Sequence, residues 1–141
     1  MSTELDLGFS WLTSTLSGDA TLAGYAPGGV SRTFAEPKTP TPYVIMSYQQ
    51  GTDQVVFGGG RAYSDLHFQV SVVGPVSDNI QALENAAARV DALLTVAQQT
   101  AVTGGTILAS FRTQPISTDT LVDGEVWNEV GGVYCLLVKG S

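Results

Sequence analysis

The sequence predicts an α+β fold, in which a mostly antiparallel β-sheet carries two α-helices packed on one face. Two segments place apolar residues at helical spacing, whereas several others are extended runs of β-branched and aromatic residues. The extended runs follow one another through short turns, which favours antiparallel neighbours. A chain of 141 residues with 43% apolar residues has the size of one domain, so one core is expected over residues 1–141.

The first helix is expected at the N-terminus, where apolar residues share one helical face: Leu5, Phe9, Leu12 and Leu16. Ser2 or Thr3 can cap its start, and Gly18 is suited to end it. The following residues, 21–42, are expected to form a loop with a short extended piece at residues 30–34. Four prolines in this stretch, Pro27, Pro37, Pro40 and Pro42, cannot donate ladder hydrogen bonds, so it should border the sheet.

Residues 43–50 and 66–72 are expected to be two strands joined by a glycine-rich hairpin. In the second of them apolar and polar residues alternate: Leu66, Phe68, Val70 and Val72 against His67, Gln69 and Ser71. A second helix is expected to begin near Asp78, which forms a capping box with Gln81 three places later. Its expected buried face is made of Ile80, Leu83, Ala87, Val90, Leu94 and Ala97.

The last third of the chain is expected to contain three more strands, at residues 107–114, 116–122 and 125–138. Asp123 and Gly124 lie between the last two and are typical of a tight hairpin turn. The order helix, strands, helix, strands completes the predicted α+β sheet.

Charge and composition favour assembly over chemistry. Charged residues are only 13% of the chain, against about 25% in soluble domains, which indicates surface that is covered by protein contacts. A net charge of −7 opposes tight binding to phosphate backbones, so direct nucleic-acid recognition is not expected. No apolar run is long enough to span a bilayer, and Cys135 is expected to be a buried strand thiol.

No motif predicts catalysis, a metal site or a cofactor. Residues 56–61, Val-Phe-Gly-Gly-Gly-Arg, lack the spacing of a phosphate loop and are better explained as a hairpin tip. His67 is the only histidine, and its sequence neighbours supply no second soft ligand and no nucleophile elbow. The carboxylates near the last turn are interpreted as a solvated or interface-lining acidic edge rather than a glycosidase pair.

The order of elements resembles the tail terminator, or tail completion, family of long-tailed bacteriophages over nearly the whole chain. The shared features are the opening helix that ends near Leu16, the Pro-Thr-Pro-Tyr-Val-Ile start of a strand at residues 40–45, strand 66–72, the helix with Ala87, Val90, Leu93 and Leu94, and the Asp123-Gly124 turn before a long strand ending at residues 133–138.

This resemblance implies a single tail-terminator-like domain, residues 1–141, that acts as a virion protein at the head-proximal end of the tail and is made in the host cytoplasm. It implies a homohexameric ring that caps the tail tube, ends its polymerisation and joins the tail to the head connector. The implied partners are copies of the chain itself, the tail tube protein and the connector or stopper protein, with DNA only passing through. An acidic subunit with few charges is expected to let DNA pass through the central channel of the ring without gripping it. A channel lined by Arg32, Arg61 and Arg112 would contradict this expectation.

Two hairpins are the expected contact sites of such an assembly. The first, residues 51–62, is expected to order on docking and offers polar and aromatic groups: Asp53, Phe57, Gly58, Gly59, Gly60 and Arg61. The second surrounds the last turn and is expected to make subunit contacts through Asp119, Asp123, Glu125 and Glu129. The alternatives are a head-closure or adaptor protein, a tail tube subunit, or a monomeric ligand-binding domain.

Overall fold

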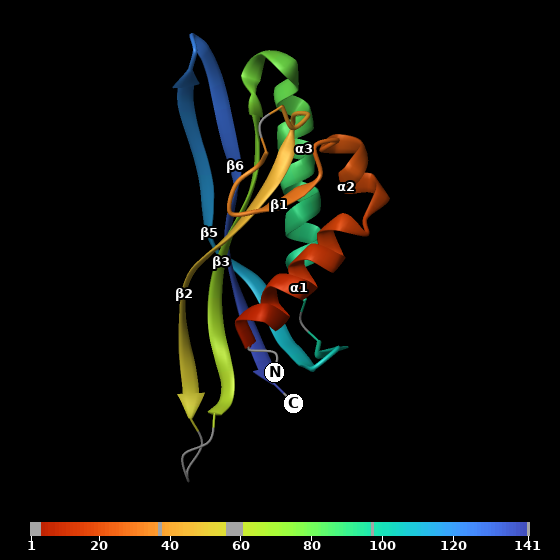
Figure 1. The fold of residues 1–141 in the computed structure, drawn as a ribbon, viewed down its shortest axis with the longest axis vertical. Coiled ribbons are helices and arrows are strands. Elements are labelled where there is room, and N and C mark those ends of the chain that lie inside the picture. The colour runs from red at the N-terminus through yellow and green to blue at the C-terminus, as the bar shows by residue number, and fades with distance from the viewer. Residues whose placement is uncertain (1–3, 37, 56–60, 97, 141) are drawn as a thin grey trace.

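A computed structural model describes residues 4–36, 38–55, 61–96 and 98–140. Within these ranges the chain forms three helices and one six-stranded sheet (Figure 1): α1 Glu4–Ser17, α2 Ala20–Tyr25, β1 Val30–Arg32, β2 Tyr43–Val55, β3 Arg61–Pro75, α3 Val76–Leu94, β4 Thr100–Val102, β5 Gly105–Val122 and β6 Glu125–Gly140. The strand order is β1-β2-β3-β6-β5-β4. The α+β class is therefore confirmed, but the expected number of two helices is wrong.

The predicted N-terminal helix is present as α1 and packs against β3. Phe9, Leu12 and Leu16 are buried, as their spacing predicts. The rings of Phe9 and Phe68 meet edge to face with their centroids 4.9 Å apart. Gly8 permits this close approach, because a Cβ atom there would lie 2.9 Å from Cζ of Phe68. Phe68 is fully buried at the centre of the core.

A second helix, α2, occupies residues that were expected to be a loop. Asp19 caps it by accepting a hydrogen bond from the backbone N–H of Leu22 at 2.9 Å. The same carboxylate accepts two hydrogen bonds from Arg89 of α3, at 2.8 and 2.7 Å. The hydrogen bonds from Arg89 and then Leu22 lower the pKa of Asp19 to about 2. A contact across 70 residues thus helps to fix a helix of only six residues.

The third helix, α3, begins earlier than predicted. Pro75 is its N-cap, so Asp78 is already the third helical residue and the capping box is wrong. The buried face consists of Leu83, Ala86, Val90 and Leu94. Ile80 does not belong to it and is 47% exposed, while Ala87 packs at its margin. Ala97 lies outside the described residues.

The sheet is mostly antiparallel, with one exception at its edge. β2 and β3 form the predicted long hairpin, and β3 pairs with β6 from Ser64 opposite Val138 to Pro75 opposite Trp127. β1 corresponds to the expected extended piece and pairs with β2 in parallel. The helices cover one face of this sheet, which we call the inner face, and leave the other, the outer face, without a helix (Figure 1).

The two strands predicted at residues 107–114 and 116–122 are one continuous strand, β5. Pro115 does not interrupt it and pairs opposite Gly132 of β6. Register shifts between Ile107 and Ala109 and between Arg112 and Gln114 mark irregular positions in this strand. Proline is tolerated in a strand whose N–H side faces away from the neighbouring strand, and β4 reaches β5 only at residues 105–107.

Close contact at the centre of the sheet depends on Gly131 of β6. A Cβ atom at this position would lie 2.1 Å from the carbonyl oxygen of Val70 and 2.6 Å from Cα of Ser71. Both atoms belong to the backbone of β3, which cannot move away without breaking its own pairing. Gly24 of α2 is the opposite case, because a Cβ atom there would have no neighbour within 4 Å.

Gly131→Ala should therefore lower the free energy of unfolding by about 1–3 kcal/mol, the usual cost of inserting an atom into a packed site. Gly24→Ala, the matched control in a helix, should be neutral or should stabilise the protein by roughly 0.5–1 kcal/mol. Urea unfolding of both variants measures the difference. Equal midpoints for the two would contradict the close approach of β3 and β6.

Candidate interaction surfaces

Two hairpins extend from opposite ends of the sheet (Figure 1). The β5–β6 hairpin ends in a turn where Asp123 and Gly124 have φ angles of 50° and 78°. These left-handed conformations suit an Asp-Gly pair and match the predicted tight turn. From residue 111 to the turn, nearly all side chains of β5 are exposed, so the helices do not cover this part of the sheet.

Exposed apolar side chains gather on this hairpin. Among the described residues, four of the seven large apolar side chains that are exposed belong to β5 or β6: Phe111, Leu121, Val122 and Val126. Leu121 is 70% exposed and lies directly opposite Val126 in the register. Grouped apolar exposure on a projecting element is typical of surfaces that other proteins cover.

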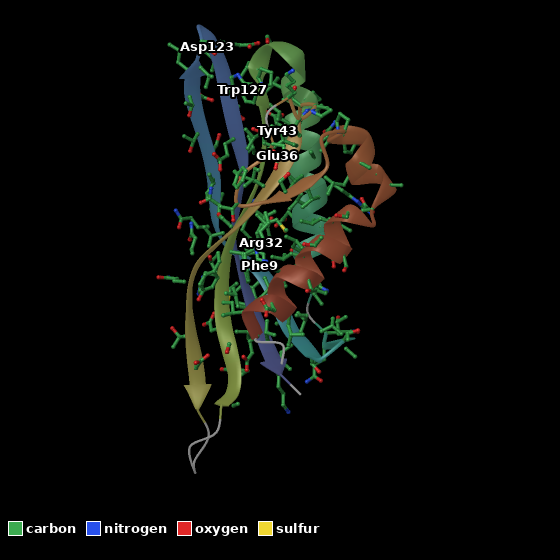
Figure 2. All side chains as sticks on the ribbon, viewed as in Figure 1. Phe9, Arg32, Glu36, Tyr43, Asp123 and Trp127 are labelled. Carbon is green, nitrogen blue, oxygen red and sulfur yellow. The ribbon has the colours of Figure 1, made fainter. Side chains whose placement is uncertain are left out.

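A groove of about 360 Å³ lies at the base of the same hairpin. It is lined by Tyr43, Val73, Thr120, Val122, Trp127, Asn128 and Glu129. The rings of Tyr43 and Trp127 are 6.5 Å apart, and Figure 2 shows both residues below Asp123 at the tip. Burial, and then the charge of Glu129, raise the pKa of the Tyr43 hydroxyl. The groove offers an aromatic floor with few charges.

Long stretches of two strands have an edge without a partner among the described residues. β1 pairs with β2 only at Val44 to Met46, and the neighbours of β5 on its outer edge end at Ser110. Residues 47–55 and 111–122 therefore present backbone donors and acceptors at the margins of the sheet. Such edges can pair with a strand of another chain.

Three of the four acidic residues expected to make subunit contacts already have partners within the chain. Asp119 accepts a hydrogen bond from the side chain of Asn128 at 2.6 Å, and Glu125 accepts one from Ser77 at the start of α3. Asp123 is exposed in the turn. These contacts help to hold the hairpin, so the carboxylates are structural as well as available at the surface.

Glu129 is the centre of a polar network on the outer face. One of its carboxylate oxygens, Oε1, accepts hydrogen bonds from Gln69 and from Ser71, each at 2.7 Å. Gln69 in turn accepts a hydrogen bond from Gln49 of β2 at 3.0 Å. The network crosses three neighbouring strands, and Ser71 is only 1% exposed. Glu129 thus satisfies a buried hydroxyl group.

The other candidate hairpin is described only in part. Asp53 of β2 accepts a hydrogen bond from Ser64 of β3 at 2.6 Å, which joins the two strands above the tip. Phe57, Gly58, Gly59 and Gly60 lie outside the described residues, as does the side chain of Arg61. Their expected role in assembly stays a prediction.

Two of the three arginines whose position bears on the expected DNA passage have partners inside the chain. Arg32 lies over the ring of Phe9, with its guanidinium carbon 3.6 Å from the ring centroid (Figure 2). Arg112 reaches Asp91 of α3 at 3.9 Å. Asp91 also accepts a hydrogen bond from the hydroxyl of Tyr134, and burial, followed by the Asp91 charge, raises the pKa of this tyrosine.

One cluster on the outer face was missed by the sequence analysis. Asp65 and His67 of β3 lie beside Cys135 of β6, which is directly opposite His67. The Cys135 thiol donates a hydrogen bond to Oδ1 of Asp65 at 2.8 Å, and Nε2 of His67 lies 3.2 Å from the same oxygen. Burial, and then this hydrogen bond, raise the pKa of Cys135 to about 12. The expected burial of Cys135 is confirmed, since it is 3% exposed.

The described helices include none with the length and apolar character required to cross a membrane.

Comparisons with known proteins relate the chain to solved structures only. No protein-family model and no curated protein matches it. Two solved chains share its fold with TM-scores of 0.61. One belongs to the virion of a native gene transfer agent particle, with 18% identity over 92% of both chains. The other has no stated function, with 21% identity over 96% of both chains. At these identities the likeness shows a common fold.

Removal of the Glu129 carboxylate tests its structural role. Glu129→Ala should lower the free energy of unfolding by about 1–3 kcal/mol, because it leaves the Ser71 hydroxyl without its acceptor. In a double-mutant cycle with Ser71→Ala, the two changes should couple by about 0.5–3 kcal/mol. Urea unfolding of the four proteins gives this coupling. Additive effects would show that Glu129 serves contacts other than the network.

Proposed function

We propose that this chain is a structural subunit of a phage-type virion, and that it is a tail terminator. In this role it forms a homohexameric ring on the finished tail tube, prevents addition of further tube subunits and offers its other side to the head connector or stopper protein. It acts by binding, without catalysis and without a cofactor. The observation that carries the proposal is the open-edged, apolar β5–β6 hairpin on a fold shared with a chain of a virion particle.

The surface of the hairpin supports assembly. A ring of identical subunits uses a different patch on each side of the subunit, so each copy needs two complementary surfaces. Leu121 and Val126 supply an apolar patch at the tip of the hairpin, and the Tyr43–Trp127 groove lies at its base. The open edge of β2 supplies a second surface elsewhere on the molecule. An unpaired strand edge can also join the sheets of neighbouring subunits.

The charge of the chain supports a passage through which DNA slides without being held. Net charge is −7, and Arg32 and Arg112 are engaged by Phe9 and Asp91. Tight phosphate binding requires cationic side chains that replace counterions. A subunit with few free cations therefore suits a channel wall more than a DNA clamp.

The apolar tip of the hairpin supplies a direct test of ring formation. Leu121→Asp and Val126→Asp should each weaken self-association at least tenfold, because a charge would be buried at the subunit contact. Ile80→Asp, at a residue that is 47% exposed on α3, is the control and should leave association unchanged. Sedimentation and electron microscopy of the purified proteins measure the result. A hairpin variant that forms rings as well as the original would refute this interface.

Particles assembled without the chain test which role it has in the virion. A tail terminator predicts tubes that are overlong or uncapped, seen by electron microscopy. A head-closure or adaptor protein predicts filled heads that leak DNA, and a tail tube subunit predicts that no tubes form. A monomeric ligand-binding domain predicts particles of normal structure. Normal tube length without the chain would contradict the terminator role.

A further inference from the structure

We propose that Asp65, His67 and Cys135 form a binding site for a divalent transition-metal ion of the zinc type on the outer face of the sheet. The site lies away from the apolar tip of the β5–β6 hairpin and is independent of the proposed role in the virion. It combines a carboxylate, an imidazole and a thiol from two paired strands (β3 and β6).

The distances between the three side chains fit a tetrahedral ion. Their potential ligand atoms all lie within 4.8 Å of one another. Oδ1 of Asp65 is 2.8 Å from Sγ of Cys135 and 3.2 Å from Nε2 of His67. Zinc bonds of usual length place neighbouring ligand atoms about 3.3–3.8 Å apart. Small side-chain rotations, together with release of the Cys135 thiol proton to solvent, therefore replace the present hydrogen bonds by bonds to an ion.

The sheet fixes the backbone of all three residues. His67 is directly opposite Cys135, and Asp65 lies two residues before His67 on the same face of β3. The paired strands β3 and β6 are flanked by β2 and β5, so the site lies on the two central strands of the sheet rather than on a loop. Ligands on rigid elements lose little entropy when they bind.

The donor set determines which ion the site would select. A thiolate and an imidazole favour zinc and similar transition metals, whereas magnesium and calcium require oxygen ligands. Three protein ligands leave the fourth tetrahedral position to water or another donor. The side chains of His67 and Asp65 are 25% and 32% exposed, while Cys135 lies behind them, so an ion can enter from solvent.

Cobalt(II) is a suitable probe, because its spectrum reports both thiolate bonding and tetrahedral geometry. The full chain, kept reduced with a phosphine, is titrated with cobalt(II) and then with zinc. We expect saturation at one ion per chain, a near-ultraviolet band from thiolate bonding, displacement by zinc but not by magnesium, and a higher melting temperature with zinc.

Variants distinguish the three-residue site from binding by a lone thiol. His67→Gln and Asp65→Asn should each weaken cobalt binding at least tenfold, and Cys135→Ser should abolish the thiolate band. Glu129→Gln, at another acid of the outer face, is the control and should bind as the original. Absence of the thiolate band in the original protein would overturn the proposal. It would also be overturned if His67→Gln and Asp65→Asn bound cobalt with the same affinity as the original protein. These two variants keep the test valid even if Cys135→Ser fails to fold.

Discussion

The pairing of β3 with β6 is the interaction on which the rest of the structure depends. On the inner face it presents Phe68, Val70 and Leu136, against which the helices bury their apolar stripes. On its margins it carries β2 and β5, whose hairpins extend beyond the helices. The outer-face network around Glu129 and the Asp65, His67 and Cys135 cluster both bridge these two strands. The fit at Gly131 is therefore a condition for the core and for both polar sites.

The elements that the sequence predicts well are those that their own periodicity defines. The stripe of α1 and the alternation in β3 need no distant information, and Asp123-Gly124 supplies its own turn. α2 escaped prediction because six residues carry little periodicity, and Asp19 reaches Arg89 across 70 residues. Separate strands were expected at residues 107–114 and 116–122, but one strand continues through Pro115, where its outer edge has no partner among the described residues. For α2 the contact with Arg89, and for β5 the pairing with β6, decides the outcome rather than the local sequence.

The candidate surfaces, like the helices and strands, could be predicted from the sequence only in part. The location of the last hairpin follows from its turn, but a sequence cannot show that Asp119 and Glu129 are engaged by Asn128 and Ser71. Nor can it show that Leu121 and Val126 are opposite each other at the exposed tip. His67 seemed isolated because its nearest soft ligand, Cys135, is 68 residues further along the chain and is brought opposite by strand register alone. Contacts that cross strands can be predicted only when the topology of the sheet is known.

The position of β6 within the sheet has a consequence for how the protein is made. This strand comes last among the described elements, yet it lies between β3 and β5 at the centre of the sheet. Until residues 125–140 leave the ribosome, the edge of β3 that pairs with β6 has no partner strand, and the apolar inner face of β3 lies at that open edge. Sheets built from such distant pairings fold slowly and expose aggregation-prone strands meanwhile. The sparing use of large apolar residues on the outer face of β3, with His67, Gln69 and Ser71, limits that exposure to one side of the nascent strand.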